Sequence, residues 1–305
     1  MKLVVGGAGF IGSHLVDRLL SEDETVDVVD DLSSGSLANL AEARSSGGAL
    51  KIHHLDAASA EADSLIGMRR PDVMFVVAGP SGADVMQHAR SFDVVLHTLE
   101  AARRHGVGKV VVALPANALY GHPASRSLPA KEGEVGQVVP RGVRGVVARA
   151  IIDLLVSYRD LHAIEFSALA LTTVYGTRQR RDGGVVAAFE TAARSHTPPR
   201  LEGGGRQTRD LLYVDDAVDA LARATDHGGG LVINVGTGVQ TSVVELWDRV
   251  AALVADADSL VPQVAPGRLD ELARFAVSPV RARIHLGWSP WTDLDAGLTQ
   301  LMSAG

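Results

Sequence analysis

The first half of the chain alternates short, almost wholly apolar runs with longer amphipathic ones. A long run at about 83–105 and an apolar run at 144–161 predict long helices. Strands that are apolar throughout are buried on both faces, as in a parallel sheet that helices cover on each side. The pattern therefore predicts a doubly wound α/β fold of the Rossmann type. The predicted strands are residues 2–5, 25–30, 50–56, 72–79, 108–115 and 164–171.

The composition changes after about residue 176, where stretches such as "SHTPPRLEGGGRQTRD" are rich in loop-forming residues. We expect residues 177–206 and 241–305 to form a smaller C-terminal subdomain that binds the substrate over the strand ends. The segments "LLYVDDAVDALARA" and "LVINVG" are expected to return to the main sheet. The predicted dinucleotide-binding domain is therefore residues 1–176 together with 207–240.

Composition and charge narrow the classes of function. The 305 residues carry a net charge of −7 and no long charged block, so we expect no nucleic-acid partner. Cysteine is absent, which excludes disulfides and thiolate metal sites, and the eleven histidines show no metal-binding spacing, so no metal is predicted. No apolar run reaches about 18 residues and no leader is evident, so we expect a cytoplasmic protein without a membrane segment.

A glycine-rich turn, "VVGGAGFIGSHL", follows the first predicted strand and opens a helix. Gly6, Gly9 and Gly12 have GxxGxxG spacing, which permits a tight turn, close approach of a pyrophosphate and close packing of helix on strand. The helix N-terminus then faces the diphosphate. The next predicted strand ends in Asp30, whose carboxylate can accept hydrogen bonds from the adenosine ribose. Together these features predict a dinucleotide site.

Asp30 also bears on the choice between NAD and NADP. A carboxylate at this point repels a 2′-phosphate, and the following "DLSSGS" offers no arginine to neutralise one. NAD is therefore favoured. Ser33, Ser34 and backbone N–H groups could still hold a phosphate, which leaves NADP open.

Further motifs follow in order along the chain: "ALYG" (118–121), "TTVYGTRQ" (172–179), "RQTRDLLYVDDAVDA" (206–220), "INVGTG" (233–238) and "LGWSP" (286–290). With the glycine-rich start, they resemble the extended short-chain dehydrogenases/reductases, in the branch of the nucleotide-sugar epimerases and dehydratases. The resemblance runs nearly end to end. It implies a small-molecule substrate and a homodimer formed by the two long helices.

The glycine turn and the resemblance together give a set of residues expected to contact NAD(P)H. Asp56 stands where the family contacts adenine, and the small residues after the fourth predicted strand are expected beneath the nicotinamide ribose. The expected cofactor-binding residues are Gly6, Gly9, Phe10, Ile11, Gly12, Asp30, Asp56, Ala57, Ala78, Gly79 and Pro80.

The family's acid–base residues have no counterpart at the matching positions. The resemblance implies a Ser or Thr, a Tyr and a Lys. The hydroxyl residue falls on Ala116. Counting back from "VYG" places the Tyr and Lys at Arg144 and Ala148, or, with one deletion, at Gly145 and Arg149. No YxxxK occurs anywhere in the chain. Neither alanine, glycine nor arginine can exchange a proton at neutral pH.

The remaining polar residues give weaker candidates for chemistry. Ser91 is a candidate to hold an oxyanion or water, Asn117 to orient a carbonyl, and Thr173 to hydrogen-bond the substrate, whereas Gln87 and His88 are expected to be solvated. The substrate-binding residues expected are Leu114, Ala116, Thr172 and Arg209, of which Arg209 matches a diphosphate-binding arginine of the family. Arg268 and Asp270 resemble a second family pair.

Three functions fit these features. The first is a ketoreductase that reduces a carbonyl of an aromatic polyketide and takes its proton from the substrate, since the pattern resembles atypical ketoreductases of the simocyclinone angucyclinone type. The second is a nucleotide-sugar epimerase or dehydratase with a displaced acid and base. The third is a dinucleotide-binding protein without catalysis.

Overall fold

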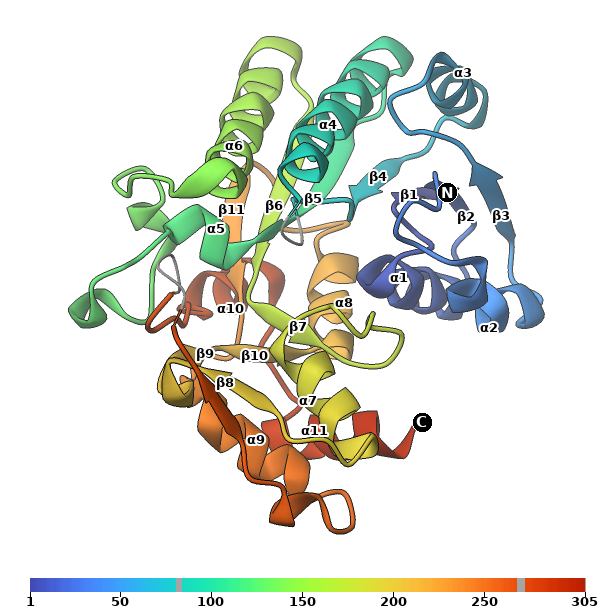
Figure 1. Cartoon of the computed structure of the whole chain (residues 1–305). Coiled ribbons are helices and arrows are strands. Elements are labelled where there is room, and N and C mark those ends of the chain that lie inside the picture. The colour runs from blue at the N-terminus through green and yellow to red at the C-terminus, as the bar shows by residue number, and fades with distance from the viewer. Residues whose placement is uncertain (81–83, 268–271, 305) are drawn as a thin grey trace.

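A parallel sheet lies at the centre of the structure, which is a computed structural model describing residues 1–80, 84–267 and 272–304. Within these residues the sheet has seven strands in the order β11-β6-β5-β4-β1-β2-β3, and every neighbouring pair is parallel (Figure 1). The predicted doubly wound α/β fold is confirmed. The strands are β1 (Lys2–Val5), β2 (Val26–Asp30), β3 (Leu50–His54), β4 (Val73–Val76), β5 (Lys109–Pro115), β6 (Glu165–Leu171) and β11 (Leu231–Val235).

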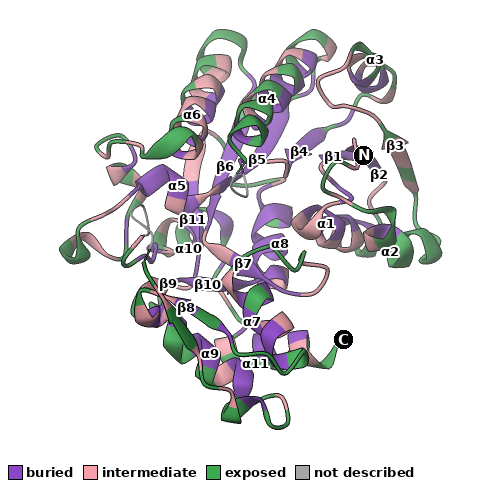
Figure 2. Cartoon of the chain, viewed as in Figure 1, coloured by how far each residue is buried: buried purple, intermediate pink, exposed green. Residues whose placement is uncertain are grey.

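Helices cover both faces of this sheet because alternate strand residues point to opposite sides. Val4 of β1 packs in the hydrophobic cluster with α1 and α8, whereas its neighbours Leu3 and Val5 pack in the cluster with α3, α4 and α6. Figure 2 shows the central strands buried between the two layers. The helices concerned are α1 (Phe10–Ser21), α3 (Ala60–Arg69), α4 (Val85–His105), α6 (Gly142–His162) and α8 (Val214–Arg223).

The two long helices α4 and α6 pack side by side on one face of the sheet (Figure 1). Each follows a strand and begins at the carboxyl edge of the sheet. The short helix α5 (Ala116–Tyr120) directly follows β5 at this edge, and the short helix α2 (Ala41–Ser45) lies between β2 and β3. The homodimer expected through α4 and α6 stays a prediction. Among the described residues, no helix is long and apolar enough to cross a membrane.

The segment after residue 176 adds small sheets and helices below the main sheet (Figure 1). β10 (Leu211–Tyr213) pairs in parallel with β7 (Thr173–Tyr175), so the expectation that "LLY" joins the main sheet is wrong. The physical reason is that β7 continues beyond the end of β6 and offers β10 a free edge, whereas β11 takes the edge of β6 itself. The division into a dinucleotide-binding domain and a substrate subdomain stays a prediction.

Among the described residues after 176, the other elements are four helices and two further strand pairs. Arg268 and Asp270 lie outside the described residues. The elements are α7 (Val185–Arg194), α9 (Val243–Ala251), α10 (Val280–Leu286), α11 (Leu294–Ser303), β8 (Arg200–Glu202) with β13 (Gln263–Ala265), and β9 (Thr208–Arg209) with β12 (Thr241–Ser242).

Candidate active site

The turn between β1 and α1 can be built only with glycine at two points. Gly6 has a φ of +80°, a conformation that strains other residues, and its N–H donates to the Val29 carbonyl at 2.9 Å. A Cβ at Gly12 would lie 2.1 Å from the Gly6 carbonyl oxygen. The glycine spacing therefore fixes how closely α1 approaches the end of β1.

The N-terminus of α1 is free of side-chain capping. Gly9 is its N-cap, and no side chain accepts from the N–H groups of the first turn. Unpaired N–H groups at a helix start attract an anion such as a diphosphate. Phe10 and Ile11 are half-buried and pack against the core, which holds this turn in place.

Asp30 ends β2 beside the glycine-rich turn and is 8% exposed. One carboxylate oxygen accepts from the Ala8 N–H at 2.8 Å and the other from the Leu32 N–H at 2.8 Å. A carboxylate oxygen accepts more than one hydrogen bond, so both remain able to receive ribose hydroxyls. Asp30 therefore stabilises the loop and can still accept hydrogen bonds from the cofactor ribose.

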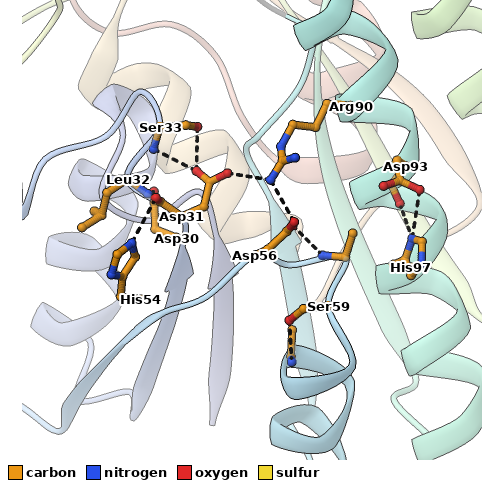
Figure 3. A network of polar contacts seen from close by, with 12 residues as sticks. Asp30, Asp31, Leu32, Ser33, His54, Asp56, Ser59, Arg90, Asp93 and His97 are labelled. Carbon is orange, nitrogen blue, oxygen red and sulfur yellow. Dashed lines mark hydrogen bonds and ion pairs between the residues drawn. The ribbon is translucent and has the colours of Figure 1, made fainter.

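Arg90 of α4 joins two carboxylates at the rim of this site (Figure 3). Its Nη2 lies 2.8 Å from Asp31 Oδ2 and 3.0 Å from Asp56 Oδ2. Asp56 also accepts from the Ala58 N–H at 3.0 Å, and Ala57 between them is half-buried. Sequence reasoning missed Arg90, because no local pattern indicates that a residue on α4 reaches the ends of β2 and β3.

Asp31 strengthens the preference for NAD. The Ser33 hydroxyl donates to it at 2.6 Å and the Ser33 N–H at 3.0 Å, so Ser33 is engaged rather than available for a 2′-phosphate. Burial raises the pKa of Asp31, but the hydrogen bonds from Ser33 and Arg90 outweigh burial and hold that pKa below its ordinary value. A second ionised carboxylate therefore lies next to Asp30.

The residues after β4 complete the predicted cofactor surface. A Cβ at Gly6 would lie 3.2 Å from the Ala78 nitrogen, so the turn after β1 and the end of β4 are in contact. A Cβ at Gly79 would lie 2.6 Å from the Ala113 carbonyl oxygen of β5. Pro80 is buried. The structure thus brings the predicted cofactor residues to the carboxyl ends of β1, β2, β3 and β4.

The three candidates for chemistry differ in how far their polar groups are engaged. The Ser91 hydroxyl donates to the Gln87 carbonyl within α4 at 3.0 Å, which argues against Ser91 as a donor to substrate. Asn117 and Thr173 are half-buried, and within the described residues neither side chain hydrogen-bonds to another group. Both stay predictions for substrate contact.

The predicted substrate-binding residues differ in burial and in their hydrogen-bond partners. Leu114 and Ala116 are 1% and 0% exposed in the core beneath α4 and α6, so they do not line an accessible pocket as expected. Thr172 donates to the buried carboxylate of Asp210 at 3.4 Å. Arg209 is half-buried on β9, and its Nη1 donates to the carbonyls of Thr208 and Leu272.

Each of the four tyrosines contacts another residue in the structure. Tyr120 donates to Asn234 at 2.7 Å and Tyr158 donates to Glu100. Tyr175 donates to the Leu294 carbonyl at 3.4 Å, and Tyr213 packs edge-on against it. Burial raises the pKa of Tyr120 and of Tyr175. That none of the four supplies the family's acid stays a prediction.

That no lysine supplies the base also stays a prediction. Lys2 and Lys109 begin β1 and β5, at the edge of the sheet opposite the cofactor surface. Lys51 lies on the outer strand β3, and Lys131 is exposed before a short 3-10 helix at Glu132–Glu134.

The α6 positions that align with the missing Tyr and Lys hold no replacement acid or base. Nε of Arg144 donates to the Pro80 carbonyl at 2.9 Å, and Ala148 is fully buried. In the other register, Gly145 packs so that a Cβ would lie 3.0 Å from the Ala118 carbonyl oxygen, and Arg149 donates to the Val135 carbonyl.

His88 was expected to be solvated, and this was wrong. It is 5% exposed, on the same buried face of α4 as Ser91 and Val95. The signal was available, because the spacing of three and then four residues is that of one helix face. Gln87 is exposed, as expected.

Comparisons with known proteins agree with this geometry. The model of the "NAD dependent epimerase/dehydratase family" matches residues 2–236. A UDP-glucose 4-epimerase of Mycolicibacterium smegmatis is 36% identical, with 98% of this chain and 96% of the relative covered. A UDP-glucuronic acid decarboxylase 5 of Arabidopsis thaliana is 30% identical, with 97% and 86% covered. The crystal structure of UDP-glucose 4-epimerase from Thermotoga maritima with UDP-glucose has a TM-score of 0.90 at 29% identity, with 99% and 97% covered. The chain therefore belongs to the NAD-dependent epimerase/dehydratase family.

Proposed function

We propose that this chain uses NAD to transfer a hydride at a carbon of a nucleoside diphosphate sugar, as an epimerase or a dehydratase does. The observation that carries the proposal is the extent of the likeness. It covers 99% of the chain in the comparison with the structure that holds UDP-glucose, and so it includes the elements after residue 176. The NAD surface built around Asp30 supplies the cofactor half of this function.

The proposal replaces our first expectation, a ketoreductase for aromatic polyketides. The relatives found are named as UDP-sugar enzymes, which favours the nucleotide-sugar alternative. Leu114 and Ala116, which were expected to bind the substrate, give no support to it either, because both are buried in the core. Neutral and acidic sugars both occur in the names of the relatives, so the family alone leaves the kind of sugar open.

Arg209 is the residue we propose for the diphosphate of the substrate. A guanidinium has five N–H donors in one plane, which suits phosphate oxygens. Bonds from Nη1 to the carbonyls of Thr208 and Leu272 hold the head group in one orientation. A substrate diphosphate then meets a guanidinium whose orientation is already fixed.

Proton transfer is the step at which this chain departs from its family. Thr173 and Asn117 can orient a sugar hydroxyl or carbonyl, but neither accepts a proton at neutral pH. A positioned general acid or base contributes about 10² to 10⁴ in rate. We therefore expect turnover slower by about that factor than in a relative that has one. The same observation favours a second candidate, a protein that binds NAD and a sugar nucleotide without turnover.

Calorimetric titration of the NAD-loaded protein with UDP-glucose, UDP-galactose and dTDP-glucose tests binding, and chromatography of long incubations tests conversion. We expect binding with slow conversion. Binding without conversion supports the second candidate, and failure of every sugar nucleotide to bind contradicts the proposal. Arg209→Gln should weaken sugar-nucleotide binding and spare NAD, whereas the exposed Arg206→Gln serves as the matched control.

A further inference from the structure

Arg144 is a half-buried cation for which the described part of the chain offers no counter-ion. It lies in the first turn of α6, and its Nε donates to the Pro80 carbonyl at 2.9 Å. Among the described residues, no carboxylate forms an ion pair with it, and burial alone accounts for the lowering of its pKa. The carbonyl bond satisfies one of five N–H donors, so Nη1 and Nη2 keep four.

Two other arginines that reach into the protein are paired with carboxylates. Arg69 makes two hydrogen bonds to the buried Asp27, and Arg178 pairs with Asp17 and with Glu42. A buried charge without a partner is strongly unfavourable, whereas a charge that meets an anionic ligand regains that energy on binding. The lack of a partner at Arg144 is therefore the signature of a binding group rather than of a structural one.

The position of Arg144 indicates which ligand it meets. Pro80 directly follows Ala78 and Gly79, which pack against the turn after β1 and against β5. The cofactor diphosphate is served by the N-terminus of α1, and α1 belongs to the helix layer on the opposite face of the sheet from α6. The anion that reaches Arg144 thus comes from the substrate, beside the end of β4.

We propose that Arg144 binds a carboxylate on the sugar ring, so that the substrate is a nucleoside diphosphate hexuronate rather than a neutral sugar nucleotide. The inference rests on the proposed function and names its substrate class. The planar edge formed by Nη1 and Nη2 matches the two oxygens of a carboxylate. The bond from Nε to Pro80 fixes the plane of the guanidinium in advance.

Titration of NAD-loaded protein with UDP-glucuronate and with UDP-glucose tests the proposal. A charge-assisted, bidentate pair predicts that UDP-glucuronate binds about 10- to 100-fold more tightly. Arg144→Gln should remove this preference by weakening UDP-glucuronate binding far more than UDP-glucose binding. Arg149→Gln is the matched control on the same helix, because Arg149 already pairs with Asp153 at 3.7 Å, and the preference should persist. Equal affinities in the wild type, or a preference that survives Arg144→Gln, overturn the proposal.

A second measurement separates this inference from the proposed function. Free D-glucuronate and D-glucose are added to NAD-loaded protein, and Tm is followed. If no sugar nucleotide binds, the proposed function fails, yet a rise in Tm with glucuronate alone, absent in Arg144→Gln, still supports a carboxylate site. No response to glucuronate overturns the site. Should Arg144→Gln fail to fold, Arg144→Lys keeps the charge without the planar fork and is expected to retain only part of the preference.

Discussion

The carboxylate of Asp30 accepts a hydrogen bond from the backbone N–H of Ala8 at 2.8 Å, which ties the end of β2 to the glycine-rich turn after β1. The two segments are 22 residues apart, yet each supplies one side of the cofactor surface. A single side chain therefore both shapes the turn that receives the diphosphate and offers oxygens to the ribose.

Replacing Asp30 should weaken NAD binding. Asp30→Ala removes the acceptor for the Ala8 and Leu32 N–H groups and the contact expected with the ribose, so we expect a loss of roughly 10- to 100-fold in NAD affinity. The preference for NAD over NADP should shrink too, because a repelling charge is gone. Calorimetric titration with each cofactor checks both effects. Asp23→Ala, at an exposed position, is the control and should change neither.

Gly12 should tolerate no side chain. In Gly12→Ala the new methyl would lie 2.1 Å from the Gly6 carbonyl oxygen, a backbone atom that cannot move aside cheaply. We expect a loss of about 1–3 kcal/mol in the free energy of unfolding, together with weaker NAD binding. Urea denaturation measures the first quantity. Gly108→Ala meets nothing within 4 Å and should stay within about 0.5 kcal/mol of the wild type. Equal stability of the two variants would contradict this account.

Arg90→Ala should loosen the adenosine end of the cofactor site. It leaves Asp31 and Asp56 without their shared partner, so two half-exposed carboxylates repel each other at the rim. Because exposed ion pairs contribute little, the expected loss in NAD affinity is only about 2- to 5-fold, and it should diminish at high salt. Arg90→Lys, which keeps one charge, should recover part of it. An unchanged affinity at low salt would show that the pair of salt bridges plays no role in binding.

Glu100 should contribute to the acid sensitivity of the fold. Hydrogen bonds from Arg103 and then from Tyr158 lower its pKa from 4.5 to about 2. A carboxyl with a lowered folded pKa stabilises the protein above its unfolded pKa, and that stabilisation is lost as the pH falls from about 4.5 to about 2.

Glu100→Gln should therefore lower stability at neutral pH slightly and make the unfolding midpoint less dependent on pH in the acid range. Urea titrations between pH 2 and pH 7 measure this. Glu61→Gln changes an exposed carboxyl that forms no ion pair within the described residues, and its pH profile should match that of the wild type. Parallel profiles for all three proteins would refute the role of Glu100.

Local pattern was enough for the elements that hold the cofactor. The apolar runs predict β1, β4, β5 and β6 because a strand buried on both faces has few polar positions. Gly6, Gly12 and Asp30 act through neighbours fixed by β1, β2 and the turn between them. Pattern was not enough for β10, whose apolar residues are equally compatible with the main sheet and with a separate pair. β10 pairs with β7 because β7 continues past the end of β6. The periodicity of the sequence does not indicate where β6 ends and β7 begins.

The sequence by itself determined the parallel sheet, the glycine-rich turn, the carboxylate beside it and the absence of a Tyr-xxx-Lys motif. Only the tertiary structure decided that Arg90 joins Asp31 and Asp56, and that Arg144 reaches Pro80 with no carboxylate partner in the described part of the chain. The reason is physical. Spacing along the chain sets which face of a helix is buried, but contacts between residues 59 and 64 positions apart depend on how whole helices rotate and pack over the sheet.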